Sequence, residues 1–333
     1  MFDNVEEVQK RLLDQSYIAG KKIATVVYLA SKLNKPVLVE GPAGVGKTEL
    51  AKVVAAAVGR KLIRLQCYEG LDESKALYEW EYSKQLLYTQ MLRDKIGEVI
   101  SGTKTLKEAS ERIAAQDDVF FSERFIVARP LLKAITSDDP VLLLIDEVDK
   151  SDPEFEAFLL EVLSDYTVSV PEIGTIQAKH LPLVFLTSND AREMTDALKR
   201  RCLHLHIDFP STEEEIRILE LKVTGIGDRL VHDIVELVQR VRKLDLKKTP
   251  SISETLDWAR ALMVMNADEL DVDLVNDTMM VILKHQGDIA KAQSELNALL
   301  QKKAAEKAAD KPQPAPGTAV PPAAPAAKKS VLH

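Results

Sequence analysis

Cysteine is scarce in this sequence. The 333 residues contain two cysteines, Cys67 and Cys202, which lie far apart and show no C-x-x-C spacing. Disulfide frameworks and zinc knuckles both need clustered cysteines, so neither is expected, and a reducing compartment such as the cytosol fits best. The acidic N-terminus is unlike a signal peptide, and no apolar run approaches the length of a membrane span. We therefore expect a cytoplasmic protein without a transmembrane helix.

Basic patches are missing as well. The formal net charge is -8 at pH 7, and no stripe rich in lysine or arginine precedes the C-terminal tail. A duplex-binding surface needs such a stripe to neutralise phosphates, so nucleic acid is not expected as a partner. Hydrophobic residues, in contrast, make up 46% of the chain. A chain of this length and composition can bury a full α/β core and one smaller domain.

A glycine-rich turn lies between an apolar run and a helical pattern. The run is residues 36–40, the turn is residues 41–48, and residues 49–58 follow with helical periodicity. This order predicts a phosphate cradle, because the glycines let backbone N–H groups point into the turn and the helix dipole favours anions. We expect Lys47 to reach the β- and γ-phosphates of a nucleotide and Thr48 to ligate Mg²⁺. The expected cradle comprises Gly41, Pro42, Ala43, Gly44, Val45, Gly46, Lys47 and Thr48.

Two acidic residues end a second apolar run. Residues 141–145 suit a strand that is buried on both faces of a parallel sheet, and Asp146 and Glu147 follow directly. At the carboxyl end of a strand, Asp146 would hold Mg²⁺, while Glu147 would orient and polarise the water that attacks the γ-phosphate. An acidic surface turn is the alternative interpretation. Together with the phosphate loop, the pair predicts hydrolysis, and the lack of an N-K-x-D element argues against GTP as the substrate.

Strand-like and helical segments alternate along residues 1–210. Helices are expected at 5–13 and 18–33, and the expected strands are 36–40, 61–67, 141–145, 183–187 and 202–209. This alternation predicts an α/β fold with a doubly wound parallel sheet and ligands at the carboxyl ends of its strands. Residues 211–301 show helical periodicity alone and predict a small all-helical domain. Residues 302–333 are rich in alanine, proline and lysine and are expected to form a disordered tail.

Two segments exceed what such a sheet requires. Residues 72–118 are expected to form helices that protrude between the second and third strands, with Leu77 and Trp80 among their apolar positions. Residues 165–178 alternate apolar and polar side chains on both sides of a Pro-Glu-Ile-Gly turn. The second pattern predicts a β-hairpin directly before the strand that leads to Asn189.

These features together resemble a known family. The phosphate loop, the Asp146–Glu147 pair, Ser188–Asn189, Arg200–Arg201 and the trailing helical lid resemble an AAA+ ATPase. The inserted helices and the hairpin resemble the MoxR branch of that superfamily. Residues 65–72, followed by Tyr-Glu-Trp at 78–80, are most similar to its carbon-monoxide-dehydrogenase accessory group, called CoxD-like. The resemblance covers roughly residues 5–300.

The resemblance implies roles for polar residues at the ends of two elements. Asn189 would hold the attacking water or the γ-phosphate, and a strand-end asparagine that caps the next helix is the alternative. Arg201 best matches the arginine finger, which neutralises charge on the γ-phosphate of a neighbouring subunit. Arg200 could serve instead, and a cation that stabilises a helix C-terminus is the plain alternative for both.

The lid departs from the family pattern. Where MoxR relatives usually carry a nucleotide-sensing arginine, this chain has Ser253 within Thr-Pro-Ser-Ile-Ser-Glu at 249–254. Arg260, two helical turns farther on, is a candidate substitute that would contact the nucleotide. An arginine on a solvated helix face is the other interpretation.

Three polar residues alternate along the last expected strand, namely His204, His206 and Asp208. They would share one face, as metal ligands on a β-ribbon do. The residues between them are apolar and would form the buried face, so a solvated polar face is the preferred interpretation. No metal besides Mg²⁺ is expected.

An arginine finger leaves the site of a single subunit incomplete. Hydrolysis is therefore expected to require a homo-oligomeric ring, hexameric by resemblance, in which ATP drives movement of one subunit against the next. The resemblance implies a metalloenzyme client that is remodelled during maturation or cofactor insertion, and a partner protein with a von Willebrand A domain. The alternatives are a nucleotide-gated scaffold with little turnover and an AAA+ motor acting on nucleic acid, which the acidic charge balance disfavours.

Overall fold

The central sheet follows the predicted parallel arrangement. A computed structural model describes residues 2–91, 93–103, 105–114, 125–170 and 174–309. Within them, five parallel strands lie in the order β2-β5-β8-β1-β9. Their bounds are β1 (Val37–Glu40), β2 (Lys61–Gln66), β5 (Val141–Asp146), β8 (Leu183–Ser188) and β9 (Leu203–His206). The last strand is shorter than expected, since it ends at His206 and the chain then leaves for the C-terminal domain.

Helices cover both faces of this sheet. Alternate residues of β5 point to opposite sides, so Leu142 packs with one cluster of buried residues and Leu143 with the other. One face is covered by α1 (Val5–Asp14), α2 (Lys21–Leu33) and α3 (Lys47–Ala57). The other is covered by α9 (Pro130–Ile135), α10 (Pro153–Asp165) and α11 (Asp196–Arg201). The doubly wound α/β prediction is confirmed, because every side chain of β5 is buried between these layers.

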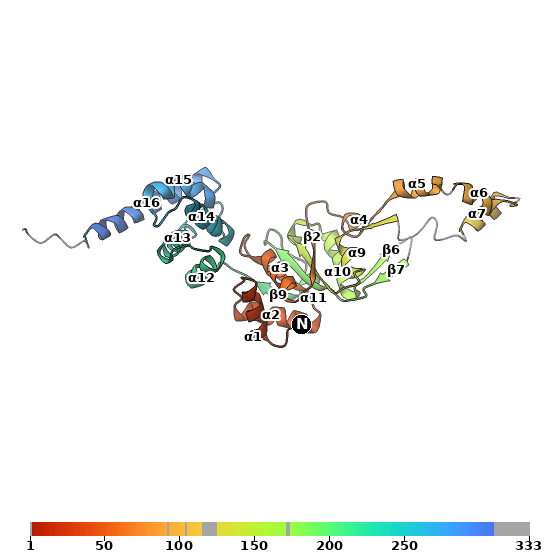
Figure 1. Cartoon of the computed structure of the whole chain (residues 1–333), viewed down its shortest axis with the longest axis horizontal. Coiled ribbons are helices and arrows are strands. Elements are labelled where there is room, and N and C mark those ends of the chain that lie inside the picture. Colours follow the sequence, from red (N-terminus) through yellow and green to blue (C-terminus); the bar gives the residue numbers. More distant parts are fainter. Residues whose placement is uncertain (1, 92, 104, 115–124, 171–173, 310–333) are drawn as a thin grey trace, which may run out of the picture.

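The insert contains strands as well as helices. Its elements are α4 (Glu73–Ala76), β3 (Tyr78–Trp80), α5 (Tyr82–Met91), α6 (Arg93–Ile100), α7 (Leu106–Ala114) and β4 (Ile126–Ala128). The expectation that Trp80 marks a helix is wrong, because Trp80 pairs with Ile126 in an antiparallel β3–β4 ribbon and its ring packs near Phe125. The arm formed by α5, α6 and α7 extends away from the sheet (Figure 1).

The predicted hairpin is present. Strands β6 (Thr167–Val170) and β7 (Gly174–Gln177) pair antiparallel. Val168 and Val170 are buried in the same cluster as α10, which fixes the register of the hairpin. Residues 171–173 of the expected turn lie outside the described residues.

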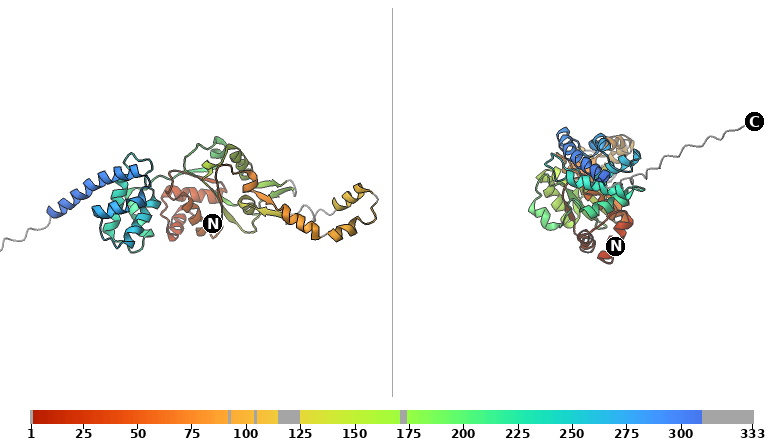
Figure 2. Two further views of the ribbon diagram at one scale, coloured as in Figure 1. Left: turned by 90° about the horizontal axis from the view of Figure 1, so that it is seen from above. Right: turned by 90° about the vertical axis from the view of Figure 1, so that its left-hand side faces the viewer.

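The C-terminal domain is helical, as expected. It contains α12 (Thr212–Lys222), α13 (Asp228–Val241), α14 (Ile252–Val264), α15 (Val272–Ile282) and α16 (Gln286–Ala309) around a core that includes Trp258. Capping boxes formed by Ser211 with Glu214 and by Ser251 with Glu254 start α12 and α14. This domain, called the lid below, and the α5–α7 arm lie at opposite ends of the molecule (Figure 2).

The end of the lid lies beyond its expected boundary. Helix α16 continues to Ala309, past residue 301, where the helical domain was expected to end. The remaining part of the expected tail, residues 310–333, lies outside the described residues. In the part of the chain that the structure describes, no helix combines the length and apolar character needed to cross a bilayer.

Candidate nucleotide site

Three chain segments meet at the carboxyl edge of the sheet. The phosphate loop, residues 41–48, follows β1, Asp146 ends β5, and Asn189 follows β8. Since β8 lies between β1 and β5, these strand ends are adjacent. A cavity of about 280 Å³ opens there and is lined by Lys47, Thr48, Asp146, Glu147, Thr187, Asn189 and Ser253, among others. We call it the core-side cavity.

The conformation of the phosphate loop requires its glycines. Gly41, Gly44 and Gly46 have φ angles of 141°, 75° and 96°, where residues with a side chain are strained. A Cβ atom on Gly41 would lie 1.9 Å from the carbonyl oxygen of Ile207, and one on Gly44 would lie 2.2 Å from Ser251 Oγ. The loop therefore fits closely between the end of the sheet and the lid, and Gly46 caps the N-terminus of α3.

The ammonium group of Lys47 lies inside this loop. The residue is only 5% exposed, and its Nζ donates to the carbonyl oxygens of Gly41 and Pro42, both at 2.6 Å. Burial lowers the pKa of Lys47 below its ordinary value, and nearby carboxylates, led by Asp190, oppose that shift. A cation that is poorly solvated and surrounded by backbone dipoles interacts strongly with an incoming anion.

Thr48 and Asp146 place two oxygen atoms side by side that could serve as metal ligands. The Thr48 hydroxyl donates to Asp146 Oδ1 at 2.9 Å, and the Thr187 hydroxyl donates to the same oxygen at 2.5 Å. Asp146 is 1% exposed. Hydroxyl and carboxylate oxygens suit Mg²⁺, which is usually held by one or two protein oxygens together with substrate phosphates. The donor set therefore fits the magnesium ion expected from the sequence.

Glu147 lies in a network beside that pair. Its backbone is in the left-handed region, with a φ angle of 57°. The Glu147 N–H group donates to Thr187 Oγ1 at 2.9 Å, which helps to hold this conformation. Its carboxylate accepts from Gln66 Nε2 at 2.8 Å and from Asn189 Nδ2 at 3.2 Å. Lys150 Nζ lies 2.7 Å from Glu147 Oε2, and this hydrogen bond raises the pKa of Lys150.

The Asn189 amide does not cap the following helix. It contacts Glu147, while Thr195 accepts from Leu198 N at the start of α11. The backbone beyond β8 is held by Asp149, whose Oδ2 accepts from the N–H groups of Asn189 and Ala191, both at 3.1 Å. Asp149 is 5% exposed, so this anchor is shielded from water. Asn189 is thus positioned from both its backbone and its side chain.

Sequence reasoning missed two residues on β2. Arg64 Nε and Nη2 approach Asp146 Oδ2 at 2.9 and 2.5 Å, and Gln66 contacts Glu147. Strand β2 pairs with β5 in parallel register, and Gln66 lies opposite Asp146. A signal was present in the alternation of Arg64 and Gln66 with apolar residues near the carboxyl end of the strand. Their targets depend on which strand lies beside β2, and the sequence does not give that order.

Arg200 and Arg201 end α11 and are exposed. Arg201 Nη1 donates to the carbonyl oxygen of Leu160 on α10 at 2.6 Å. Neither arginine is among the residues that line the core-side cavity of its own chain. The structure therefore does not bring Arg201 together with Thr48 and Asp146, and leaves it on the surface.

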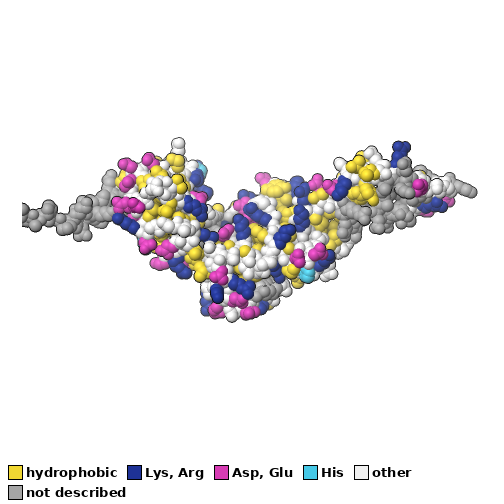
Figure 3. Space-filling model, in the orientation of Figure 1, with side chains coloured by type: hydrophobic (Ala, Val, Ile, Leu, Met, Phe, Trp, Pro, Cys, Tyr) yellow, Lys and Arg dark blue, Asp and Glu magenta, His cyan; other side chains and the backbone are white. Residues whose placement is uncertain are grey.

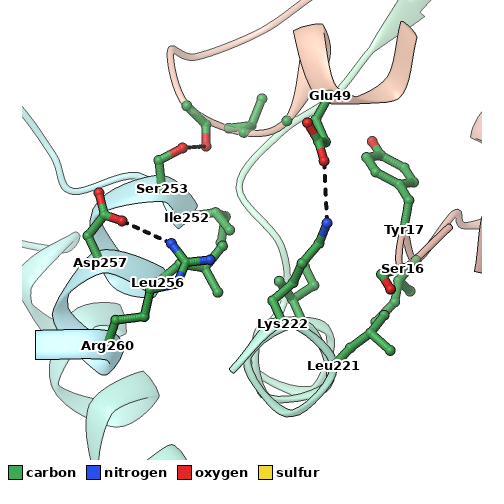
Figure 4. A pocket seen from close by; sticks show the side chains of 15 residues that line it. Ser16, Tyr17, Glu49, Leu221, Lys222, Ile252, Ser253, Leu256, Asp257 and Arg260 are labelled. Carbon is green, nitrogen blue, oxygen red and sulfur yellow. Dashed lines mark hydrogen bonds and ion pairs between the residues drawn. The ribbon is translucent and has the colours of Figure 1, made fainter. Parts of the chain in front are cut away.

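A second cavity, of about 330 Å³, lies between the phosphate loop and the lid (Figure 4). We call it the lid-side cavity. Tyr17 contributes from the linker before α2, and burial raises the pKa of its hydroxyl. Lys222 of α12 reaches across to Glu49 of α3, with Nζ 3.3 Å from Oε1. Gly44, Gly46, Glu49 and Ser253 line both cavities, so the two are contiguous.

The lid places Ser253 and Arg260 at this second cavity. Ser253 Oγ donates to the carbonyl oxygen of Gly44 at 3.5 Å, and Arg260 Nη1 lies 3.1 Å from Asp257 Oδ1 (Figure 4). The Arg260 side chain is 54% exposed. It lines the lid-side cavity and not the core-side cavity, so the structure does not bring it together with Lys47 and Thr48.

The three alternating polar residues near β9 do not form a metal centre. His204 Nε2 contacts the carboxylate of Glu40 on β1, while His206 and Asp208 are exposed. Among the described residues, no group of three or more histidine, cysteine, aspartate or glutamate side chains is placed to hold a metal ion. The interpretation as a solvated polar face agrees with this arrangement.

Similarity to known proteins extends over the region that carries this geometry. The chain is 26% identical over 239 residues to uncharacterized proteins of Staphylococcus aureus strains USA300 and NCTC 8325, a match that covers 69% of this chain and 76% of each relative. Among solved structures, the Holliday junction branch migration motor RuvB of Thermotoga maritima matches with a TM-score of 0.45 and 18% identity, over 83% of this chain and 73% of that chain. Residues 36–202, half of the chain, match the model of the AAA domain (dynein-related subfamily). The phosphate loop, the Asp146–Glu147 pair and Asn189 all lie within that match, and the chain belongs to this family of nucleotide-dependent ATPases.

Proposed function

We propose that the chain binds Mg²⁺–ATP across the two contiguous cavities and hydrolyses it. The observation that carries this proposal is the contact between the Asn189 amide and the Glu147 carboxylate, beside the Thr48–Asp146 pair. The core-side cavity would take the triphosphate, because residues of the phosphate loop, Lys47 among them, line it at the N-terminus of α3. The lid-side cavity, with Tyr17 at its wall, would take the base.

Each polar group of the core-side cavity would have one task. Lys47 would bind the β- and γ-phosphates, and Thr48 and Asp146 would hold Mg²⁺, which neutralises phosphate charge when bound. Glu147 would orient and polarise the attacking water, and it lies within hydrogen-bond reach of Asn189. Asn189 would then fix the same water or an oxygen of the γ-phosphate.

Arg201 would complete the site of a neighbouring subunit. Its exposed position at the end of α11 supports this role, since a residue that acts in another subunit must lie on the surface. An arginine finger contributes about 10³ to 10⁵ in rate, so a lone subunit would hydrolyse ATP slowly. We infer a homo-oligomeric ring, with a hexamer as the expected closed form.

The work of the ring would be directed at a protein. The resemblance to the MoxR branch and its CoxD-like group supports a chaperone that remodels a metalloenzyme during maturation or cofactor insertion, together with a partner that carries a von Willebrand A domain. The arm adds support, because Leu86, Leu87 and Met91 on α5 are 61%, 58% and 75% exposed (Figure 3). Exposed apolar side chains of this kind suit contact with another protein.

One observation favours a second candidate, a nucleotide-gated scaffold with little turnover. By the resemblance to the MoxR branch, Ser253 stands where an arginine is usual, and the guanidinium of Arg260 is paired with Asp257. A lid without a cation at the phosphates would stabilise the transition state less. A motor acting on nucleic acid has less support, because acidic and basic side chains are interspersed on the face shown in Figure 3 and the net charge is -8.

Substitution of the water-activating residue tests the proposed hydrolysis. Glu147→Gln keeps the shape of the side chain and removes its charge, so ATP binding should persist while turnover falls by about 10²-fold or more. Glu154→Gln makes the same chemical change on an exposed residue of α10 and serves as the matched control. ATP affinity and phosphate release would be measured for both variants. Unchanged turnover in Glu147→Gln would remove the proposed site.

A further inference from the structure

The carboxylate of Asp146 is saturated by protein groups on both oxygens. Oδ1 accepts from the hydroxyls of Thr48 and Thr187, and Oδ2 accepts from Arg64 Nε and Nη2 at 2.9 and 2.5 Å. Asp146 is 1% exposed, whereas the side chain of Arg64, on the edge strand β2, is 47% exposed. A guanidinium that can reach solvent thus neutralises a carboxylate that cannot.

Arg64 also links Asp146 to Glu147. Its Nη2 donates to Gln66 Oε1, and Gln66 Nε2 donates to Glu147 Oε2 at 2.8 Å. The amide of Gln66 has one acceptor and one donor end, so its orientation is set by a cation on one side and a carboxylate on the other. The metal-binding carboxylate and the water-activating carboxylate are therefore joined through two side chains of one strand.

A divalent cation at Asp146 would change this balance. A buried carboxylate needs a counter-charge, which Arg64 supplies in the arrangement described above. Mg²⁺ carries twice the charge of a guanidinium, so a guanidinium on the same carboxylate repels the ion. The Arg64 side chain can move from Asp146 into solvent, because nearly half of it is already exposed.

We propose that Arg64 is a positioning residue that acts as the resident counter-cation of Asp146 and is displaced when Mg²⁺–nucleotide binds. This inference rests on the proposed Mg²⁺–ATP site and adds a role for residues outside the phosphate loop.

A Mg²⁺ titration of ADP binding tests the displacement. The full chain would be titrated with ADP by calorimetry at a series of Mg²⁺ concentrations, for the wild type, Arg64→Ala and Lys61→Ala. Because Arg64 competes with the ion, Arg64→Ala should lower the half-saturating Mg²⁺ concentration by about 5-fold or more. Lys61→Ala removes an exposed cation from the other end of β2 and should leave it unchanged. An unchanged or raised concentration in Arg64→Ala would overturn the proposal.

Two further variants keep the test decisive. Arg64→Lys preserves the charge but has no planar fork to span Asp146 and Gln66, so its half-saturating Mg²⁺ concentration should lie between those of the wild type and Arg64→Ala. Gln66→Ala leaves the Arg64–Asp146 pair and should stay within about twofold of the wild type. If Gln66→Ala lowered the half-saturating Mg²⁺ concentration as much as Arg64→Ala does, the effect would come from a general disturbance of β2. That result would contradict the proposed role of the Arg64 guanidinium.

A stability measurement separates this inference from the proposed function. Without nucleotide and in EDTA, Arg64→Ala should lower the unfolding temperature, because Asp146 loses its counter-charge; Mg²⁺–ADP should narrow that deficit. A deficit of the same size with and without Mg²⁺–ADP would overturn the displacement. If the wild type itself bound no Mg²⁺–ADP, the proposed function would fail, and not only the role of Arg64.

Discussion

Substitution of Gly44 by alanine probes the contact between the phosphate loop and the lid. A Cβ atom at this position would lie 2.2 Å from Ser251 Oγ and 2.5 Å from Ser251 Cβ. The hydroxyl can rotate away, but the Cβ atom moves only with the backbone at the start of α14. Gly44→Ala should therefore push the lid and the loop apart, in addition to the strain of a φ angle of 75° in a residue with a side chain.

Gly59 offers a matched control. Its φ is 67°, close to that of Gly44, and a Cβ atom there would meet nothing within 4 Å. Left-handed strain costs about 1–2 kcal/mol, so both alanine variants should lose about that much unfolding free energy. Only Gly44→Ala should also lose nucleotide affinity, by about tenfold or more, because it alone pushes the lid away from the phosphate loop. A tenfold loss corresponds to about 1.4 kcal/mol of binding free energy.

Urea unfolding and calorimetric ADP titration would measure the two effects separately. Adding Ser251→Gly to Gly44→Ala removes the opposing Cβ atom and should restore part of the lost affinity, although α14 then loses its N-cap hydroxyl. If Gly44→Ala bound ADP as tightly as Gly59→Ala, the close fit of loop and lid would not contribute to binding. That result would refute the reasoning from the contact distances.

Two other contacts make sharp predictions. Arg242→Met in the lid removes the charged partner of the fully buried Glu215 carboxylate, 2.6 Å away, and leaves that charge with neutral hydrogen-bond donors only. The change should cost about 3–5 kcal/mol of unfolding free energy. In urea unfolding the double variant with Glu215→Leu should recover much of that loss, and no recovery would contradict a charge effect. Asp149→Ala removes the anchor of the Asn189 and Ala191 N–H groups, so steady-state assays should show a lower kcat with little change in KM. Asp149→Asn keeps a carbonyl oxygen that can accept these hydrogen bonds and should retain more turnover than Asp149→Ala. Equal losses of kcat in both variants would show that the hydrogen bonds to the Asn189 and Ala191 N–H groups do not account for the effect.

The sequence predicts the sheet well because its strands are parallel and buried. Runs such as Val-Leu-Leu-Leu-Ile before Asp146 are typical of strands covered on both faces, and all five expected strands appear. The β3–β4 ribbon was missed for a different reason. Each of its strands has three residues, and Trp80 finds its partner Ile126 on the far side of the whole insert. Such pairing depends on tertiary contact and leaves little local pattern.

Some residues of the candidate site could likewise be predicted from the sequence, and others could not. Lys47, Thr48, Asp146 and Glu147 follow from local motifs, because each motif places its side chains at a strand end. Tyr17, Lys222 and Arg64 could not be found in this manner, since they come from a helix linker, the lid and a neighbouring strand. Their roles arise from how distant elements pack and from strand order. Motif spacing therefore predicts the residues expected to contact phosphate and Mg²⁺. The residues that line the rest of the cavities or neutralise Asp146 can be identified only from the three-dimensional structure.

We propose that neighbouring subunits complete each site, and a mixing experiment tests this proposal most directly. Arg201→Ala subunits keep Glu147 but lack the finger, and Glu147→Gln subunits keep the finger but cannot activate water. Each should be nearly inactive alone. In an equal mixture, about a quarter of random interfaces pair an intact Glu147 with an intact Arg201, so turnover should rise to about a quarter of the wild-type rate per subunit. A mixture as inactive as its components would contradict action between subunits.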